Sequence, residues 1–166
     1  MRHPFIPLEK KLIRTFESLN TEALAADLAD GEWTKLLKRK LGSLASEQGY
    51  ITSTSGVDGR FFGEWLFDLI WYADDSDGHL VELKLVLESE WRTWDAIWYD
   101  FEKLLVAKCE HKVMVFQASD KHFATYIDGM TSAIDRFYPS VPNERYLFAG
   151  WNKTTSEFEF YLKVSS

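Results

Sequence analysis

Residues 64–73, with the sequence EWLFDLIWYA, carry apolar side chains at both odd and even positions. A strand with this pattern has to be covered on both of its faces. The segment Leu80–Trp91, LVELKLVLESEW, alternates apolar and polar residues, and the turn-forming sequence DDSDG lies between the two segments. We therefore expect residues 64–73 and 79–90 to form a β-hairpin within a layered sheet.

The rest of the chain predicts helices and strands on either side of this hairpin. The spacing of apolar residues and a capping position at Asn20 predict helices over 8–19, 21–28, 31–48, 94–108 and 121–137. Short or apolar strands are expected within 50–63 and at 112–116, 145–151 and 157–164. This order predicts one α/β domain over residues 1–166, with a mixed sheet and helices on its faces.

The composition limits the classes of protein that fit. The chain has 26 acidic and 19 basic side chains and a net charge of −7, which argues against broad nucleic-acid binding. No apolar run approaches the roughly 20 residues of a membrane span, and the N-terminus lacks the apolar core of a secretory signal. The lone Cys109 suits a reducing compartment. We expect a cytoplasmic protein that does not associate with membranes.

Asp68 is the unusual residue of the first hairpin strand. It is the only charged residue from 66 to 73, and its neighbours on the same side are apolar. Burying an unpaired carboxylate costs several kcal/mol, so Asp68 needs a partner or a function. With a turn centred near Ser76, hairpin counting places Asp68 opposite Lys84.

The second hairpin strand carries Glu82, Lys84, Glu88 and Glu90 at positions of the same parity. An alternating strand of this kind is usually a solvated face with cross-strand charge pairs, and Asp68 with Lys84 would then be a structural pair. Alternatively, Asp68 faces the acidic row, where a cation must neutralise the carboxylates. Oxygen ligands at this density suit Mg²⁺. The apolar surroundings of Asp68 favour the second interpretation.

An Asp on one hairpin strand and a Glu-x-Lys or Glu-x-Glu pair on the next resemble the restriction-endonuclease-like superfamily, the PD-(D/E)xK nucleases. The sequence ESEW, followed by DFEKLL and an apolar strand, is similar to uncharacterised members of that superfamily. The resemblance covers about residues 47–116. It implies an αβββαβ restriction-endonuclease-like core over about 47–137, flanked by N-terminal helices at 8–48 and C-terminal strands at 144–164. Asp68 follows Phe67 rather than the Pro of the motif.

The resemblance implies two alternative sets of catalytic residues. Asp68 would be the first acid in both. The following pair is either Glu82 with Lys84, which fits E-x-K literally, or Glu88 with Glu90, an E-x-E variant. The ESEW and DFEKLL sequences favour Glu88 and Glu90, whereas hairpin counting places Lys84 nearer to Asp68. A β-bulge or an asymmetric turn would change that register.

The resemblance also implies a Mg²⁺ or Mn²⁺ cofactor. Asp68, Glu88 and Glu90 would be the metal ligands, and some members add a Glu from the helix before the strands. Glu47 is the candidate for that ligand and Glu64 is the alternative. The metal would polarise the scissile phosphate and lower the pKa of a bound water.

Two further roles follow from the resemblance. Glu90 would hold a second ion or act as general base. Lys84 or Lys103 would supply positive charge. Lys103 is equally explained as an exposed helix residue paired with an acid.

A nuclease with this net charge requires a local basic surface, a homodimer or a partner protein to bind DNA, the favoured substrate. Residues 1–50 hold 8 basic and 7 acidic side chains, and the remainder holds 11 and 19. Lys35, Lys38 and Arg39 have the spacing of one helix face, which is either solvated or a patch for phosphates.

Two non-catalytic functions compete with the nuclease hypothesis. The chain could be an acidic immunity or inhibitor protein, which predicts exposed carboxylates spread over a surface. It could also be a degenerate nuclease fold used for binding or assembly.

The tryptophans offer a weaker signal. Trp91, Trp94 and Trp98 are spaced to share a helix face with Phe101, which core packing explains. Stacking on splayed bases is the alternative.

Overall fold

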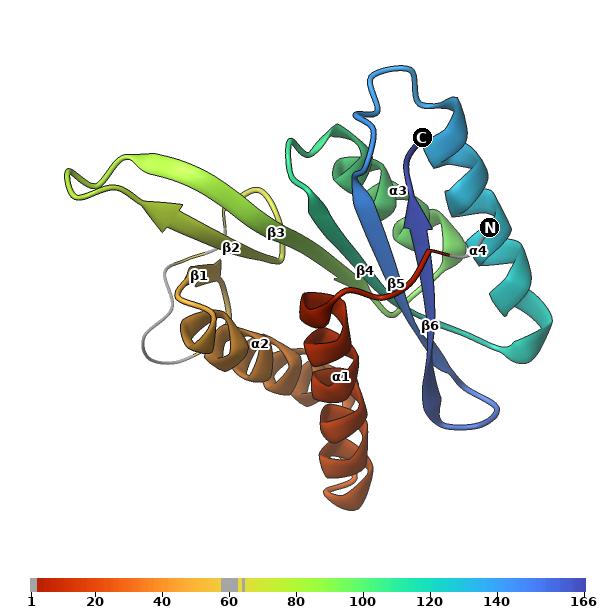
Figure 1. Ribbon diagram of the computed structural model, residues 1–166. Helices are drawn as coiled ribbons and strands as arrows, with labels where there is room; N and C mark the ends of the chain where they lie inside the picture. The colour runs from red at the N-terminus through yellow and green to blue at the C-terminus, as the bar shows by residue number, and fades with distance from the viewer. Residues whose placement is uncertain (1–2, 58–62, 64) are drawn as a thin grey trace.

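The computed structural model describes residues 3–57, 63 and 65–166, and these residues form an α/β fold with one mixed sheet (Figure 1). The predicted class, a mixed sheet with helices on its faces, is confirmed. In chain order the elements are α1 (Pro7–Ala25), α2 (Asp30–Glu47), β1 (Ile51–Thr54), β2 (Leu69–Asp74), β3 (Leu80–Glu90), α3 (Trp94–Val106), β4 (His111–Ala118), α4 (Asp120–Arg136), β5 (Arg145–Asn152) and β6 (Glu157–Val164).

The six strands lie in the sheet in the order of the sequence, from β1 to β6. Strands β1, β2 and β3 form an antiparallel meander. Strands β3, β4 and β5 are parallel, and β6 returns antiparallel to β5. Parallel neighbours need a crossover connection, which α3 and α4 provide.

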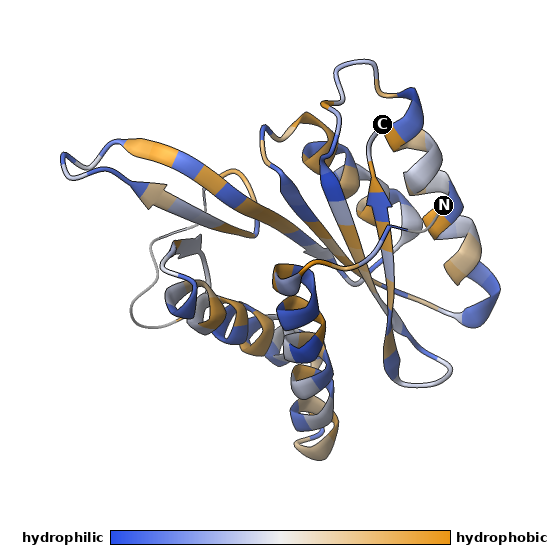
Figure 2. Ribbon diagram, viewed as in Figure 1, coloured by the Kyte–Doolittle hydropathy of each residue, from blue (hydrophilic) through white to orange (hydrophobic). Residues whose placement is uncertain are grey.

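Two apolar cores lie on opposite faces of the sheet. On one face, α1 and α2 pack against odd-numbered strand residues such as Leu69, Leu87 and Val113. On the other face, α3 and α4 pack against Ile70 and Met114, among others. The helices alternate hydrophobic and hydrophilic residues, as expected for elements with one buried side (Figure 2). Covering both faces explains why the central strands read as continuous apolar runs.

The expected break near Asn20 is wrong, because α1 continues to Ala25. Asn20 does not cap a helix. Its side-chain amide donates to the carbonyl of Ser156 at 3.0 Å and accepts from the indole of Trp151 at 3.0 Å. These contacts to the β5–β6 hairpin give Asn20 a tertiary partner, so the helix has no reason to restart there.

The first strand of the hairpin begins later than expected, at Leu69 rather than at residue 64. Leu66 adopts a left-handed backbone with φ of 66°, which a strand ladder does not accommodate. Asp68 therefore lies immediately before β2.

Within the described parts of the chain, no helix combines the length and the apolar composition needed to cross a bilayer.

Candidate functional site

The register of β2 and β3 aligns Asp68 with Glu88. Leu69 pairs with Leu87, so Asp68 and Glu88 are the next residues along the two antiparallel strands. The expectation from hairpin counting, that Asp68 lies opposite Lys84, is wrong. The ladder has two irregularities, between Trp71 and Tyr72 and between residues 73 and 74, and each adds a residue to β3.

Lys84 is one of these extra residues, and it reverses the side-chain alternation of β3. Leu83 and Val86 both pack on the core under α3 and α4. Leu85 and Leu87 pack on the core under α1 and α2. A bulge has this effect because it inserts one residue into a period of two.

The four charged residues of β3 therefore do not form one row, and this expectation is also wrong. Glu82 accepts a hydrogen bond from the hydroxyl of Tyr50, on the α2 side of the sheet, at 3.3 Å. Lys84 lies 3.8 Å from Glu82 and 3.7 Å from Glu110. Glu88 faces α3 instead, so the structure does not bring Glu82 or Lys84 to Asp68 and Glu88.

Neighbouring strands hold Asp68 in place. The Ser89 backbone N–H donates to Oδ2 of Asp68 at 2.8 Å, and the Ser89 hydroxyl lies 3.1 Å from the same oxygen. The hydroxyl of Thr54 in β1 donates to the Asp68 carbonyl at 2.6 Å. Both the carboxylate and the backbone of this residue are therefore positioned by the antiparallel meander.

Glu88 is completely buried, with an exposure of 0 %. The ammonium of Lys103 in α3 lies 2.7 Å from its Oε1. The same ammonium lies 3.1 Å from Asp100, one helical turn earlier. Oε2 of Glu88 has no hydrogen-bond partner among the described residues. A buried carboxylate oxygen without a partner is costly, which makes it a position where a ligand can be bound.

The electrostatics of this cluster follow from burial. Burial raises the pKa of Glu88 to about 8, the Lys103 ammonium opposes the shift, and the Asp68 carboxylate adds to it. Burial also raises the pKa of Asp100. Burial acts to lower the pKa of Lys103, but its pairs with Glu88 and Asp100 outweigh burial and raise it. Lys103 is therefore the constant positive charge of the cluster.

Glu90 has a different partner. Its carboxylate accepts from Nε of Arg92 at 3.0 Å and from Nη2 at 2.6 Å, and it also accepts from the Arg92 backbone N–H. These hydrogen bonds lower the pKa of Glu90. Both of its oxygens are occupied by the side chain of Arg92, which lies just after the end of β3.

The predicted nucleic-acid-binding residues do not form one exposed patch, and their role in binding stays a prediction. Lys38 is buried, and its ammonium donates to the carbonyl of Ser55 at 3.1 Å. Lys35 is exposed and forms an ion pair with Glu32 at 2.8 Å. Arg39 is exposed and lines a groove between α1 and α2.

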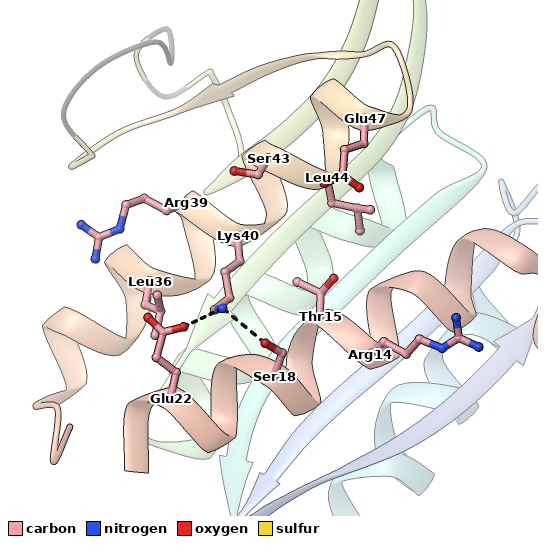
Figure 3. Close-up of a pocket in the computed structure, with 10 residues that line it drawn as sticks. All are labelled: Arg14, Thr15, Ser18, Glu22, Leu36, Arg39, Lys40, Ser43, Leu44 and Glu47. Atoms are coloured by element: carbon pink, nitrogen blue, oxygen red, sulfur yellow. Dashed lines mark hydrogen bonds and ion pairs between the residues drawn. The ribbon is translucent and has the colours of Figure 1, made fainter. Parts of the chain in front are cut away.

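Figure 3 shows this groove, which both basic and acidic side chains line. Lys40 lies between the two helices, 2.7 Å from Glu22. Arg14 and Arg39 point away to either side. Glu47, the predicted additional metal ligand, is exposed at the end of α2 and lines the same groove. The structure does not bring it to Glu88, which faces α3. Its alternative, Glu64, lies outside the described residues.

Two members of the cluster escaped the sequence analysis. Asp100 is part of the DFEKLL sequence and precedes Lys103 by three residues, so helical spacing was an available signal. Ser89 offers no such signal, because its contact with Asp68 depends on the register.

The described residues contain no group of three or more His, Cys, Asp or Glu side chains placed to hold a metal ion. What the structure does assemble is the pair Asp68 and Glu88, with Lys103 and Asp100 beside it. No family model, no curated protein and no solved structure matches this chain.

Proposed function

We propose that this protein is a metal-dependent nuclease with a restriction-endonuclease-like core, and that it hydrolyses phosphodiester bonds of nucleic acid, with DNA as the favoured substrate. The elements from α2 to β4 have the order αβββαβ. The observation that carries the proposal is the alignment of Asp68 with the buried Glu88, together with Lys103 at 2.7 Å from Glu88. The acids come from two paired strand segments and the lysine from the following helix.

The residues present fit a Mg²⁺ or Mn²⁺ ion in its usual setting. Mg²⁺ binds one or two protein carboxylates and completes its shell with waters and substrate phosphates, so three protein ligands are not required. Asp68 and Glu88 would hold it, because Oε2 of Glu88 has no hydrogen-bond partner in the described structure and Ser89 occupies only Oδ2 of Asp68. When bound, the ion would polarise the phosphate and acidify a water molecule.

The other residues of the cluster would position the reacting groups and balance the negative charge of the phosphate. Ser89 orients the Asp68 carboxylate. Lys103 would place a positive charge beside the phosphate, a role that requires a group charged at all physiological pH values. Asp100 holds the Lys103 ammonium at 3.1 Å and so limits its rotation. Glu90 contributes less, because Arg92 already binds both of its oxygens.

Metal binding tests the first part of the proposal. Mg²⁺ and Mn²⁺ are titrated by calorimetry into the wild type and into Asp68→Asn, Glu88→Gln and the matched control Glu82→Gln. We expect saturable binding that weakens by about tenfold or more in the first two variants and not in the control. Binding that survives in Asp68→Asn would show that the ion sits elsewhere.

Cleavage tests the second part. Nicking of supercoiled DNA in Mg²⁺ or Mn²⁺ is compared for the wild type, Lys103→Met and the control Lys84→Met. Loss of the Lys103 charge should slow cleavage by about 10²–10³-fold, as removal of one preorganised stabilising group does. Equal rates for the two lysine variants would remove Lys103 from the mechanism. No cleavage of DNA or RNA by the wild type would contradict the nuclease proposal.

A second candidate function, binding without catalysis, is favoured by one observation. Arg92 pairs with Glu90, and Lys103 pairs with both Glu88 and Asp100, so protein cations already contact three of the four clustered carboxyl groups. A degenerate nuclease fold predicts that Asp68→Asn leaves nucleic-acid binding intact in a gel-shift assay while the wild type shows no cleavage. The acidic inhibitor hypothesis fits less well, because Glu88 and Glu90 are buried and cannot be presented to a partner.

A further inference from the structure

Three tryptophans from separate parts of the chain line a cavity of about 180 Å³. Trp33 comes from α2, Trp91 follows β3, and Trp151 lies near the end of β5. Gln117 adds an amide from the end of β4. Because β3, β4 and β5 are parallel, these residues meet at the carboxyl edge of the sheet, where α/β folds usually bind ligands.

This cavity is separate from the Asp68–Glu88 cluster. Trp33 and Trp91 pack on the core under α1 and α2, whereas Glu88 faces α3. The prediction that Trp91 shares a helix face with Trp94 and Trp98 is wrong, because Trp91 precedes α3 and turns to the opposite side of the sheet.

The tryptophan rings form inclined walls. Trp33 and Trp91 have ring centroids 6.2 Å apart and an interplanar angle of 59°. Trp33 and Trp151 are 5.7 Å apart at 64°. A planar base or nucleoside stacks between parallel rings, and neither pair is parallel. Rings that contact one another at about 60° leave no flat slot for a base, so the cavity that they line suits a compact, rounded group better.

The charge at the cavity selects a cation. Asp30, in the first turn of α2, is exposed and is the only charged residue among the described residues that line the cavity. A cation gains from the electron-rich ring faces as well as from this carboxylate. The cavity is also small beside the 300–1,000 Å³ of pockets for drug-sized ligands.

We propose that Trp33, Trp91, Trp151 and Asp30 form an aromatic cage that binds a quaternary ammonium group. The methyl groups of such a cation would fill the apolar cavity that the indoles line, with its charge near the ring faces and Asp30. A primary ammonium fits less well, because the indole walls offer it no hydrogen-bond acceptors and only Asp30 and Gln117 could replace its lost hydration.

The first experiment compares a cation with a neutral molecule of the same shape. Choline and 3,3-dimethylbutan-1-ol are titrated separately into the full chain, with NMR shifts of the indole N–H groups as the readout. Choline should bind about 5- to 30-fold more tightly, which corresponds to the cation–π contribution of a partly desolvated site. Equal binding of the neutral molecule, or no binding of choline, would overturn the proposal.

Matched variants locate the site. Trp33→Phe should weaken choline binding by about 2- to 5-fold, while Trp98→Phe, which alters a half-buried tryptophan on the other side of the sheet, should not. Asp30→Asn should weaken it by a similar factor, while Asp95→Asn, an exposed first-turn acid of α3, should not. Asp30 is exposed, so its variant tests the cage even where Trp33→Phe fails to fold. Equal effects in the test and control variants would overturn the assignment.

The same chemistry occurs in free metabolite cations and in trimethylated lysine side chains. A peptide with one trimethyllysine is therefore titrated beside choline, with the unmethylated peptide as its control. Tighter binding of the trimethyllysine peptide would identify a protein as the partner, and tighter binding of choline would identify a small molecule. Equal binding of the unmethylated peptide would overturn the quaternary ammonium assignment.

Discussion

Buried charged side chains in this protein are matched one by one with partners. Lys112 is fully buried, yet its ammonium lies 2.8 Å from Glu144 and 2.9 Å from the hydroxyl of Tyr146. Burial lowers the pKa of Lys112, and Glu144 opposes that shift. Glu88 differs, because one of its oxygens has no hydrogen-bond partner in the described structure. An incompletely paired buried acid is typical of functional sites rather than of structural ion pairs.

The burial of His111 predicts that the stability of the protein depends on pH. His111 is buried at the start of β4, and burial lowers the pKa of its imidazole, while Glu110 partly opposes the shift. The folded pKa is thus below the unfolded value of about 6.5. The unfolded state takes up the proton first as pH falls, so this contribution to stability is complete above pH 6.5 and is lost as pH falls through the folded pKa.

We expect His111→Gln to flatten the decline of unfolding free energy below about pH 6.5. Urea denaturation at several pH values between 4.5 and 7.5 measures this slope. His79→Gln is the control, because His79 is exposed in the β2–β3 turn. If the unfolding free energy of His111→Gln declined below pH 6.5 as steeply as that of the wild type, the prediction would be contradicted.

At the scale of elements, β5 depends on a close approach that only glycine permits. A Cβ built on Gly150 would meet the ring of Phe123, and it would lie 2.8 Å from Cζ of Phe116. Both rings belong to the core between the sheet and α4. Gly150 therefore sets how closely α4 can pack on β5.

We expect Gly150→Ala to lower the unfolding free energy by about 1–3 kcal/mol, the usual cost of overpacking a core. Gly129→Ala in α4 is the control, because its Cβ would lie 3.4 Å from Trp94 and alanine favours a helix by about 0.5–1 kcal/mol. The denaturation midpoint should therefore fall for Gly150→Ala, and it should rise or stay unchanged for Gly129→Ala. A neutral Gly150→Ala would mean that the two rings can move aside without loss.

At the scale of the whole molecule, one ion pair ties the N-terminal helix to β5, the strand next to the edge strand β6. Glu9 in α1 is 1 % exposed, and its carboxylate binds Nε of Arg145 at 2.6 Å and Nη2 at 3.0 Å. The same carboxylate accepts from the backbone N–H of Ile6 at 2.9 Å. Glu9 thus caps its own helix and docks that helix onto the first residue of β5.

We expect Glu9→Ala to destabilise the protein by about 1.5–3 kcal/mol, the range for hydrogen bonds to charged groups. Asp135→Ala is the control. This variant breaks the ion pair between Asp135 and Lys163, whose charged atoms lie 2.6 Å apart. Asp135 is half exposed, and ion pairs at the surface contribute about 1 kcal/mol or less. The two unfolding free energies should differ clearly, and equal values would show that α1 docks without this contact.

The sequence by itself determined the class of the fold and most of its elements. The periods of apolar residues are local, so α2, α3, α4 and the strands after them could be predicted near their observed bounds. The isolated Asp68 and the acids of β3 were also visible, because a charge inside an apolar strand is conspicuous in any register.

Only the tertiary structure decided which of those acids meet. The extra residue Lys84 moves Glu82 and Glu88 to opposite faces, and no feature of β3 alone shows where a ladder will slip. Asp100, Ser89 and the three tryptophans of the cavity join sites through contacts between distant elements. The physical reason is the same in each case. Periodicity sets which side of an element a residue occupies, whereas the neighbouring elements decide what that side faces.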